Sequence, residues 1–259
     1  MNASVEDRRQ QVMARLDRVT DPELDEPVTE LGFITGVDVD DGLVGIRFRL
    51  PTYWCSANFA FLMADDMRRE VGRLDWVRDV RVQLGEHMEA ERINAGMRDG
   101  LTFRESFAEA ADAELDVIRA TFARKSFQHR QHQLLQRLRG DGHAPEAIVA
   151  MTVGRLRGLT GEAVARLVER YLERRGVPGA FDDASAAFVD TEGVALAAGS
   201  LGAYLRTLRN VTVNMEFNGA LCRGLLAARF DEPQPADTGP DLRHFLREAA
   251  RATHPETSA

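Results

Sequence analysis

The sequence is poor in cysteine. Cys55 and Cys222 are the only two among its 259 residues, and 167 positions separate them. Two thiols cannot form the network of disulfide bonds that stabilises small secreted domains, and they cannot supply a four-cysteine metal site from one chain. A cysteine with a chemical function here therefore acts alone or with groups from outside the chain.

Long apolar runs and an excess of positive charge are also absent. No run approaches the about 18 residues that span a bilayer, and the N-terminal sequence MNASVEDR has no apolar core of a signal peptide. The formal net charge is −8, which argues against general nucleic-acid binding because that requires a basic surface. We therefore expect a cytoplasmic protein that binds neither membranes nor nucleic acids.

The overall composition is that of a globular protein. Hydrophobic residues make up 44% of the chain and charged residues 29%, which excludes wholesale disorder. The length suits one large domain or two modest ones.

The first 85 residues carry the patterns of a small α+β domain. Apolar residues with helical or alternating spacing predict a helix over 7–19, strands over 33–39 and 43–50, a helix over 57–72 and a strand over 76–84. Asp40-Asp41-Gly42 is a hairpin turn signal between the first two strands. The order α-β-β-α-β predicts a domain over residues 1–90 with a three-stranded, mostly antiparallel sheet.

From residue 91 to residue 230 the periodicity is helical, so we expect an all-α extension of the first domain. Thr102 to Glu105 match a capping box, which marks a helix start. Further helices are predicted over 112–138, 144–156, 160–175, 194–209 and 214–229. Residues 231–259 are predicted to form a proline-rich linker, a short helix over 241–251 and a flexible tail.

Two histidines share one face of a predicted helix. His129 and His132 are three positions apart, which allows half of a metal site. Their polar neighbours Gln128, Arg130 and Gln131 favour a solvated face instead. No Glu-x-x-His pair repeats, as a di-iron site in a helix bundle would require.

The residues with the clearest chemical potential lie in the segments Asp21-Pro22-Glu23-Leu24, Glu30-Leu31-Gly32 and Leu50 to Cys55. Cys55 stands between a strand end and a helix that Ser56 is expected to cap, and a helix N-terminus favours the thiolate that binds metal. Asp21 and Glu23 could fold over this loop and orient a ligand, accept a proton or bind metal. The alternative is that Cys55 is a small buried apolar residue and the acids cap a turn.

With these segments, residues from about 8 to 85 resemble the iron–sulfur assembly family typified by SufT and by the PaaD protein of phenylacetate degradation. The Asp-Pro-Glu-Leu motif, the Glu-Leu-Gly segment, the hairpin and the Thr-x-x-Cys loop carry the resemblance, which covers about a third of the chain. It implies that Asp21, Glu23, Thr52 and Cys55 are functional. It also implies that the protein is not an enzyme but matures iron–sulfur or related iron centres of client metalloenzymes, together with other assembly proteins.

The loop departs from the family pattern, which has proline two residues before the cysteine and one after it. This sequence has Tyr53 and Ser56 at those positions. Tyr53 and Trp54 could bind a partner or pack on the helical region, and packing is the favoured interpretation. The helical extension resembles a long-form branch associated with operons for binuclear-iron monooxygenases. Such an enzyme would then be the client, and the helical region its docking surface.

Ligand counting limits the mechanism. One functional cysteine cannot hold a cluster that needs four ligands, so we expect a transiently bound iron or iron–sulfur species and favour a homodimer. Cys222 is a candidate second ligand, although its apolar surroundings favour a place in the core. His87 follows the third strand and could approach the Cys55 loop. Two alternatives stay open: a metal-free, chaperone-like adaptor that docks a client through its helices, and a thiol enzyme with Cys55 as nucleophile and His87 as base.

Overall fold

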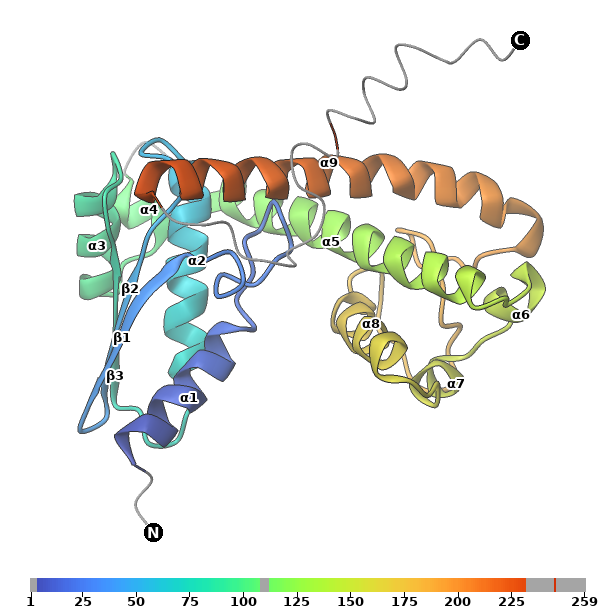
Figure 1. The fold of residues 1–259 in the computed structure, drawn as a ribbon, viewed down its shortest axis with the longest axis horizontal. Helices are drawn as coiled ribbons and strands as arrows, with labels where there is room; N and C mark the ends of the chain where they lie inside the picture. Colours follow the sequence, from blue (N-terminus) through green and yellow to red (C-terminus); the bar gives the residue numbers. More distant parts are fainter. Residues whose placement is uncertain (1–3, 108–111, 232–244, 246–259) are drawn as a thin grey trace. The chain divides into compact units, whose positions relative to one another are not determined.

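The structure is a computed structural model that describes residues 4–107, 112–231 and 245. It divides into two compact units (Figure 1). The described residues of the first unit come from Met1–Val117 and Glu216–Ala259, and those of the second from Ile118–Met215. The division differs from the predicted domains, which end at residues 90 and 230, because the chain passes between the units inside two long helices.

The first unit contains a three-stranded sheet in the order β1-β2-β3. β1 (Ile34–Asp40) and β2 (Leu43–Phe48) are antiparallel, and Asp41 and Gly42 join them with the positive φ angles of a tight hairpin turn, 40° and 83°. β3 (Asp79–Leu84) pairs with β2 in parallel, because a helix carries the chain back to the same end of the sheet. The predicted α+β class and element order are confirmed. The sheet itself is mixed, with one antiparallel and one parallel pair.

Two helices pack on the sheet and form the core of the first unit (Figure 1). α1 (Val5–Leu16) begins at Ser4, which forms a capping box with Asp7, and α2 (Ala57–Val71) follows β2. Alternate residues of β2 and β3 face inward, as the sequence pattern predicts. The buried core includes Leu16, Val44, Ile46, Phe48, Phe61, Met63, Met67, Val80, Val82 and Leu84.

Two short helices extend this unit beyond residue 90. α3 (Ala90–Asp99) packs against β3 and α2. α4 (Phe103–Ser106) begins with the predicted capping box, in which the Thr102 N–H donates to Glu105 Oε2 over 2.7 Å. The Phe103 ring packs edge-on against Phe61 with the ring centroids 5.4 Å apart.

The second unit is helical. It contains the C-terminal part of α5 (Asp112–Gly140), then α6 (Pro145–Val149), α7 (Val153–Arg157), α8 (Glu162–Arg174) and the N-terminal part of α9 (Ala198–Phe230). The sequence predicts one helix over 144–156, whereas the structure has α6 and α7 with Thr152 capping the second. Its buried core includes Phe127, Leu134, Leu135, Tyr171, Phe188 and Leu205.

α9 is one continuous helix of 33 residues, where the sequence predicts two helices over 194–209 and 214–229. The stretch between them, Asn210 to Val213, consists of weak helix formers. Thr212, which belongs to this stretch, is buried, and so is Leu208, which precedes the stretch. Tertiary packing therefore stabilises the helix where local propensity does not.

The prediction of a solvated face at His129 and His132 is wrong. Their exposed fractions are only 6% and 7%, and Gln131 between them is fully buried. Gln131 donates hydrogen bonds to Tyr171 Oη (3.2 Å) and to the Val189 carbonyl oxygen (2.7 Å). Burial, and then the charge of Arg209, lower the pKa of His132.

Among the described residues, no helix combines the length and the apolar character needed to cross a bilayer. The linker and short helix predicted within 231–259 lie outside the described residues, apart from Asp231 and Phe245.

Candidate functional site

The Asp-Pro-Glu-Leu motif forms a closed turn in the first unit. Thr20 and Pro27 pair as an isolated antiparallel bridge and close the turn at its base. Inside it, Oδ1 of Asp21 accepts hydrogen bonds from the backbone N–H groups of Glu23 (2.8 Å) and Leu24 (3.0 Å). Asp25 adopts a left-handed conformation with φ of 55° and completes the turn. The motif thus holds Asp21 at one fixed position against the core.

Asp21 is a buried carboxyl group with an altered acidity. Its exposed fraction is 8%, and this burial raises the pKa of the carboxyl group to about 6, against the two backbone hydrogen bonds that lower it. Glu23 and Glu26 add a smaller upward shift through their negative charges. Burial of an ionisable group beside other acids is typical of functional sites, because it costs stability that a purely structural turn does not require.

Contacts with Thr52 and His87 hold the Cys55 loop in place. Thr52 Oγ1 lies 3.0 Å from Cys55 Sγ, within hydrogen-bond distance. His87 Nδ1 accepts the Glu89 N–H over 3.1 Å, so Nε2 carries the proton and donates it to the Cys55 carbonyl oxygen over 2.7 Å. The predicted approach of His87 to this loop is therefore observed, but its ring meets the backbone of Cys55 rather than the thiol. This geometry does not form the thiol–imidazole pair of a cysteine nucleophile and its base.

The residues around the thiol are apolar and open to solvent. Tyr53 is 51% exposed, Trp54 is 71% exposed and Met88 is 56% exposed. The Met88 N–H donates to the Tyr53 carbonyl oxygen over 2.9 Å, so these side chains come from neighbouring segments. The favoured expectation that Tyr53 and Trp54 pack on the helical region is wrong. Ser56 occupies the predicted N-cap position of α2, but its side chain makes no capping hydrogen bond.

The C-terminal end of α9 lies on both loops. Asn218 Nδ2 donates to Glu23 Oε1 over 3.2 Å, and Arg223 forms an ion pair with Glu26. Further along the helix, Arg229 donates to the carbonyl oxygens of Leu50 (3.2 Å) and Glu86 (2.9 Å).

Sequence reasoning missed these three α9 residues as part of the site. A partial signal was present for two of them: Asn218 and Arg229 are eleven residues apart, about three helical turns, which places both polar side chains on one helix face.

The same face brings Cys222 to the site. Burial raises the pKa of the Cys222 thiol to about 12, and the charges of Asp21, Cys55, Glu23 and Glu26 add to this shift in that order. The structure thus brings Thr52 and Cys55 together in one loop and Asp21 and Glu23 together in one turn, and α9 contacts both segments.

The region offers metal donors without a complete set. Thiols and carboxylates suit iron chemically. However, no group of three histidine, cysteine or acidic side chains within the described ranges has the geometry of a finished metal site. Any iron species bound here requires further ligands that arrive with it.

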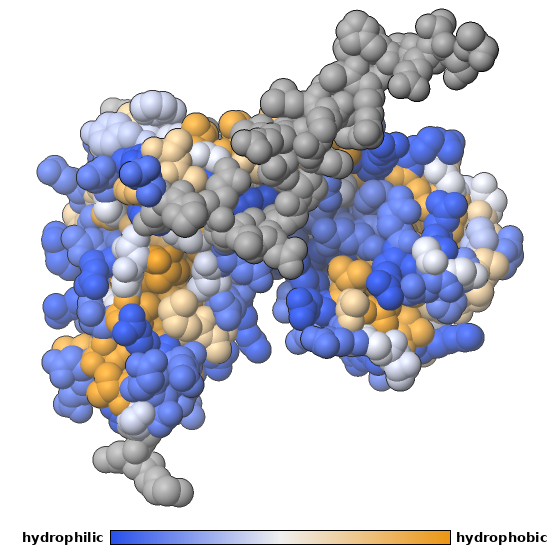
Figure 2. All heavy atoms as spheres, in the orientation of Figure 1, coloured by the Kyte–Doolittle hydropathy of each residue, from blue (hydrophilic) through white to orange (hydrophobic). Residues whose placement is uncertain are grey.

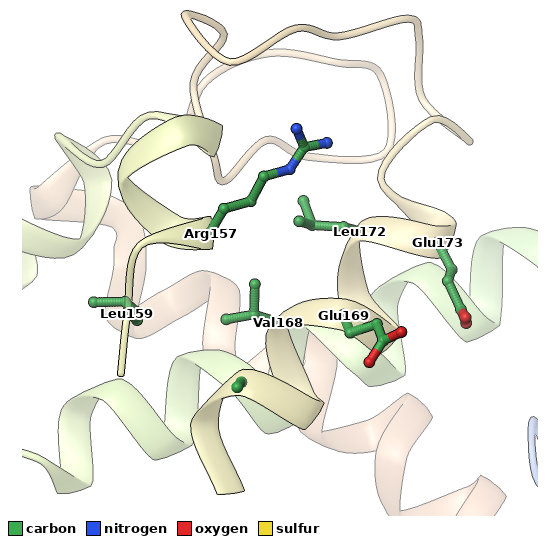
Figure 3. A pocket seen from close by; sticks show the side chains of 7 residues that line it. Arg157, Leu159, Val168, Glu169, Leu172 and Glu173 are labelled. Atoms are coloured by element: carbon green, nitrogen blue, oxygen red, sulfur yellow. The ribbon is translucent and has the colours of Figure 1, made fainter. Parts of the chain in front are cut away.

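The second unit contains a separate surface hollow of about 400 Å³ on α7 and α8 (Figure 3). Val168 and Leu172 point from α8 toward Arg157, and Leu159 completes an apolar floor. Figure 2 shows this apolar area over α8. Its lining residues include two carboxylates, those of Glu169 and Glu173, but no thiol and no imidazole.

Comparisons with known proteins identify the first unit's family. The model of the iron–sulfur cluster assembly protein family matches residues 9–84, which contain Asp21, Glu23 and Cys55. The Fe–S protein maturation auxiliary factor YitW of Bacillus subtilis (strain 168) is 31% identical over 77 residues, which are 29% of this chain and 74% of YitW. The resemblance seen in the sequence is confirmed, and the family is one of assembly and maturation factors rather than a class of enzymes. This chain therefore belongs to the iron–sulfur cluster assembly protein family.

Proposed function

We propose that this protein matures the iron–sulfur or related iron centre of a client metalloenzyme by binding the iron species transiently at Cys55. The position of Cys55 carries the proposal. Its thiol lies in a loop fixed by Thr52 and His87 and is flanked by side chains that are open to solvent. Because the site lacks a full ligand set, its cargo is held loosely enough to be passed on.

Each site residue has a proposed role. Cys55 contacts metal or sulfur, and Asp21 and Glu23 orient or ligate the iron species. Thr52 and Ser56 support the loop, and His87 positions the Cys55 backbone.

Docking of the client is assigned to the apolar residues around the thiol. A carrier must bring its cargo within bonding distance of the acceptor, so the surface next to Cys55 has to face the client. Tyr53, Trp54 and Met88 are exposed there, and aromatic residues and methionine are enriched in protein interfaces. The resemblance to the long-form branch favours a binuclear-iron monooxygenase as client. Other assembly proteins are proposed as further partners. A homodimer would supply additional ligands for the iron species. The proposed location of the protein is the cytoplasm.

The test is the iron and acid-labile sulfide content of the full chain after strictly anaerobic purification and after reconstitution with iron and sulfide. We expect iron and sulfide in the wild type, loss of both in Cys55→Ala, and retention in Thr207→Ala, an exposed control on α9 in the second unit. Equal iron content in the wild type and Cys55→Ala would contradict the role of the thiol. Absence of iron in both, with client binding intact, would favour the metal-free adaptor.

A further inference from the structure

The outward side of α9 is apolar in its C-terminal half. Between residues 217 and 228 the exposed positions are Phe217, Leu221, Leu225 and Ala228. The first three are 40%, 37% and 39% exposed. They follow one another at intervals of four residues, so their side chains form one row along the helix. We call Phe217, Leu221 and Leu225 the α9 stripe.

The N-terminal half of the same helix has a different surface. Its exposed positions include Arg206, Thr207, Arg209 and Asn210. A solvated helix face normally carries such polar and charged residues, whereas contiguous exposed apolar residues mark a surface that binds something. The change from polar to apolar along one helix therefore indicates that the α9 stripe receives another segment or another protein.

The α9 stripe is separate from the side of the helix that holds the Asp-Pro-Glu-Leu turn. On that side, Asn218 donates to Glu23 and Arg223 pairs with Glu26. Arg223 and Leu226 are each only 6% exposed. The stripe can therefore bind a further segment while α9 keeps its contacts with the turn.

One residue from the C-terminal part of the chain lies on the stripe. The ring of Phe245 packs edge-on against that of Phe217, with the ring centroids 5.5 Å apart and an angle of 88° between the ring planes. This T-shaped arrangement is one that pairs of aromatic rings prefer. Both residues belong to the first unit. The contact identifies which segment reaches the stripe.

The chain between α9 and Phe245 is long enough for this contact. Phe245 follows Asp231 by fourteen positions, and Phe217 precedes Asp231 by the same number. Fourteen extended residues reach up to about 46–50 Å, whereas fourteen helical residues extend only about 21 Å. The linker can therefore bring Phe245 back along α9 to Phe217.

The residues that follow Phe245 have a suitable apolar pattern. Leu246, Ala249 and Ala250 come at helical spacing after it, and two charged residues lie between Leu246 and Ala249. This spacing predicts an amphipathic helix with Phe245 on its apolar side. Such a helix presents to the stripe the kind of face that packs on another apolar helix face.

We propose that the α9 stripe is the docking surface for the chain's own C-terminal segment, which packs on it through Phe245 and the apolar residues that follow. The inference goes beyond the proposed function and does not depend on iron, because neither the stripe nor Phe245 belongs to the proposed iron site. The docked segment holds α9 from its outward side, while Asn218 and Arg223 hold it from the side of the turn.

The test places the photo-crosslinking residue p-benzoylphenylalanine at position 245 of the full chain, because this residue keeps an aromatic ring there. After irradiation and digestion, mass spectrometry identifies the peptide that has been linked. An equal mixture of isotopically labelled and unlabelled protein distinguishes links within one chain from links between two chains. We expect links within one chain, to the part of α9 that carries Phe217, Leu221 and Leu225.

A variant of the stripe tests the contact from the other side. Leu221→Ser in the crosslinking protein should lower the yield of this link about twofold or more, because it removes apolar surface that docking buries. The matched control is Leu101→Ser, which changes a leucine of the first unit that is 36% exposed, against 37% for Leu221, and that lies outside α9. It should keep the yield.

A second measurement needs no crosslinker. The dye 8-anilinonaphthalene-1-sulfonate becomes fluorescent on exposed apolar surfaces. Phe245→Ser in the full chain should raise the fluorescence of this dye, because the stripe loses its occupant. Leu101→Ser should leave the fluorescence at the wild-type value.

Several results would overturn the proposal. These are no link from position 245, a link to a part of the chain other than the C-terminal half of α9, and equal yields in Leu221→Ser and Leu101→Ser. Links that join labelled to unlabelled chains would assign the stripe to a second copy of the protein and overturn it as well. Unchanged dye fluorescence in Phe245→Ser would show that this residue does not keep the segment on the stripe.

Discussion

Asn218 donates a hydrogen bond to Glu23 across 195 positions of sequence, with 3.2 Å between Nδ2 and Oε1. The bond joins α9 to the motif that carries the family resemblance. Arg223 and Arg229 add an ion pair to Glu26 and hydrogen bonds to the backbone of Leu50 and Glu86. The helical extension is therefore part of the first unit's site and not only an appendage to it.

Replacement of Asp21 by Asn should stabilise the protein at neutral pH. The pKa of Asp21 rises from 3.8 to about 6 on folding. The protonated form is thus favoured by the folded state, and its contribution is complete below pH 3.8 and lost as the pH rises through about 6. At pH 8 the ionised group lowers the free energy of unfolding by about 3 kcal/mol relative to acid. Asn retains the Oδ1 acceptor and avoids this cost.

The measurement is urea unfolding at pH 4 and pH 8, followed by the fluorescence of Trp54 and Trp76. These are the two tryptophans of the chain, and both belong to the first unit. Asp21→Asn should gain about 2 kcal/mol over the wild type at pH 8, and much less at pH 4. If Asp21→Asn and the wild type differ in free energy of unfolding by the same amount at both pH values, the ionised Asp21 carboxylate does not destabilise the fold.

Removal of His87 should loosen the Cys55 loop. The ring is 4% exposed and bonds both the Cys55 carbonyl oxygen and the Glu89 N–H. His87→Ala leaves both backbone groups without their partner, so we expect a loss of about 1–3 kcal/mol in the free energy of unfolding. The alkylation rate of Cys55 should also rise.

The conservative variant His87→Gln distinguishes positioning from packing. Gln can donate to the Cys55 carbonyl oxygen, so it should return the alkylation rate toward the wild-type value. If His87→Ala and His87→Gln alkylate equally fast, the hydrogen bond does not control the loop.

Substitution of the exposed Tyr53 and Trp54 should slow the transfer of iron to an acceptor protein without changing how much iron the protein binds. Tyr53→Ser combined with Trp54→Ser should change the unfolding free energy by less than about 1 kcal/mol, because both side chains are mostly solvated. The iron content after reconstitution should stay unchanged, and the rate of transfer to an apo-ferredoxin should fall. Unchanged transfer would exclude these residues from the docking surface.

Substitution of Gly42 in the hairpin turn should destabilise the protein. Gly42 has φ of 83°, and a Cβ there would stand 3.0 Å from the Trp76 carbonyl oxygen and 2.8 Å from Arg78 Nε. Gly42→Ala should lower the free energy of unfolding by about 1–2 kcal/mol.

Gly140→Ala is the matched control, because a Cβ at this last residue of α5 would meet no atom within 4 Å. It should be neutral or stabilising by up to about 1 kcal/mol. Thermal unfolding followed by circular dichroism measures both variants. A smaller loss for Gly42→Ala than for Gly140→Ala would contradict the strained turn.

Local patterns in the sequence were sufficient for α1, α2 and the three strands of the first unit, whereas α3 (Ala90–Asp99) was not predicted. The alternation in β2 and β3, the Asp41-Gly42 turn and the Thr102 capping box each depend on neighbours within a few residues. The parallel pairing of β3 could not be derived in this way, because it depends on where the intervening helix returns the chain.

Only the site residues that belong to short sequence motifs could be predicted. Short motifs indicated Asp21, Glu23, Thr52 and Cys55. The contacts of Asn218 and Arg223 bridge nearly two hundred residues, and no local pattern encodes such distances. The same limit explains His129 and His132, whose polar neighbours indicated solvent although packing within the second unit encloses them.

The first unit is discontinuous, since its chain leaves within α5 and returns within α9. During synthesis, Cys55 and the Asp21 turn emerge from the ribosome long before Cys222 and Arg223. At about 5–20 residues per second, the nascent family domain spends many seconds without α9. The Asp21 turn therefore gains its contacts to Asn218 and Arg223 only when synthesis is nearly complete.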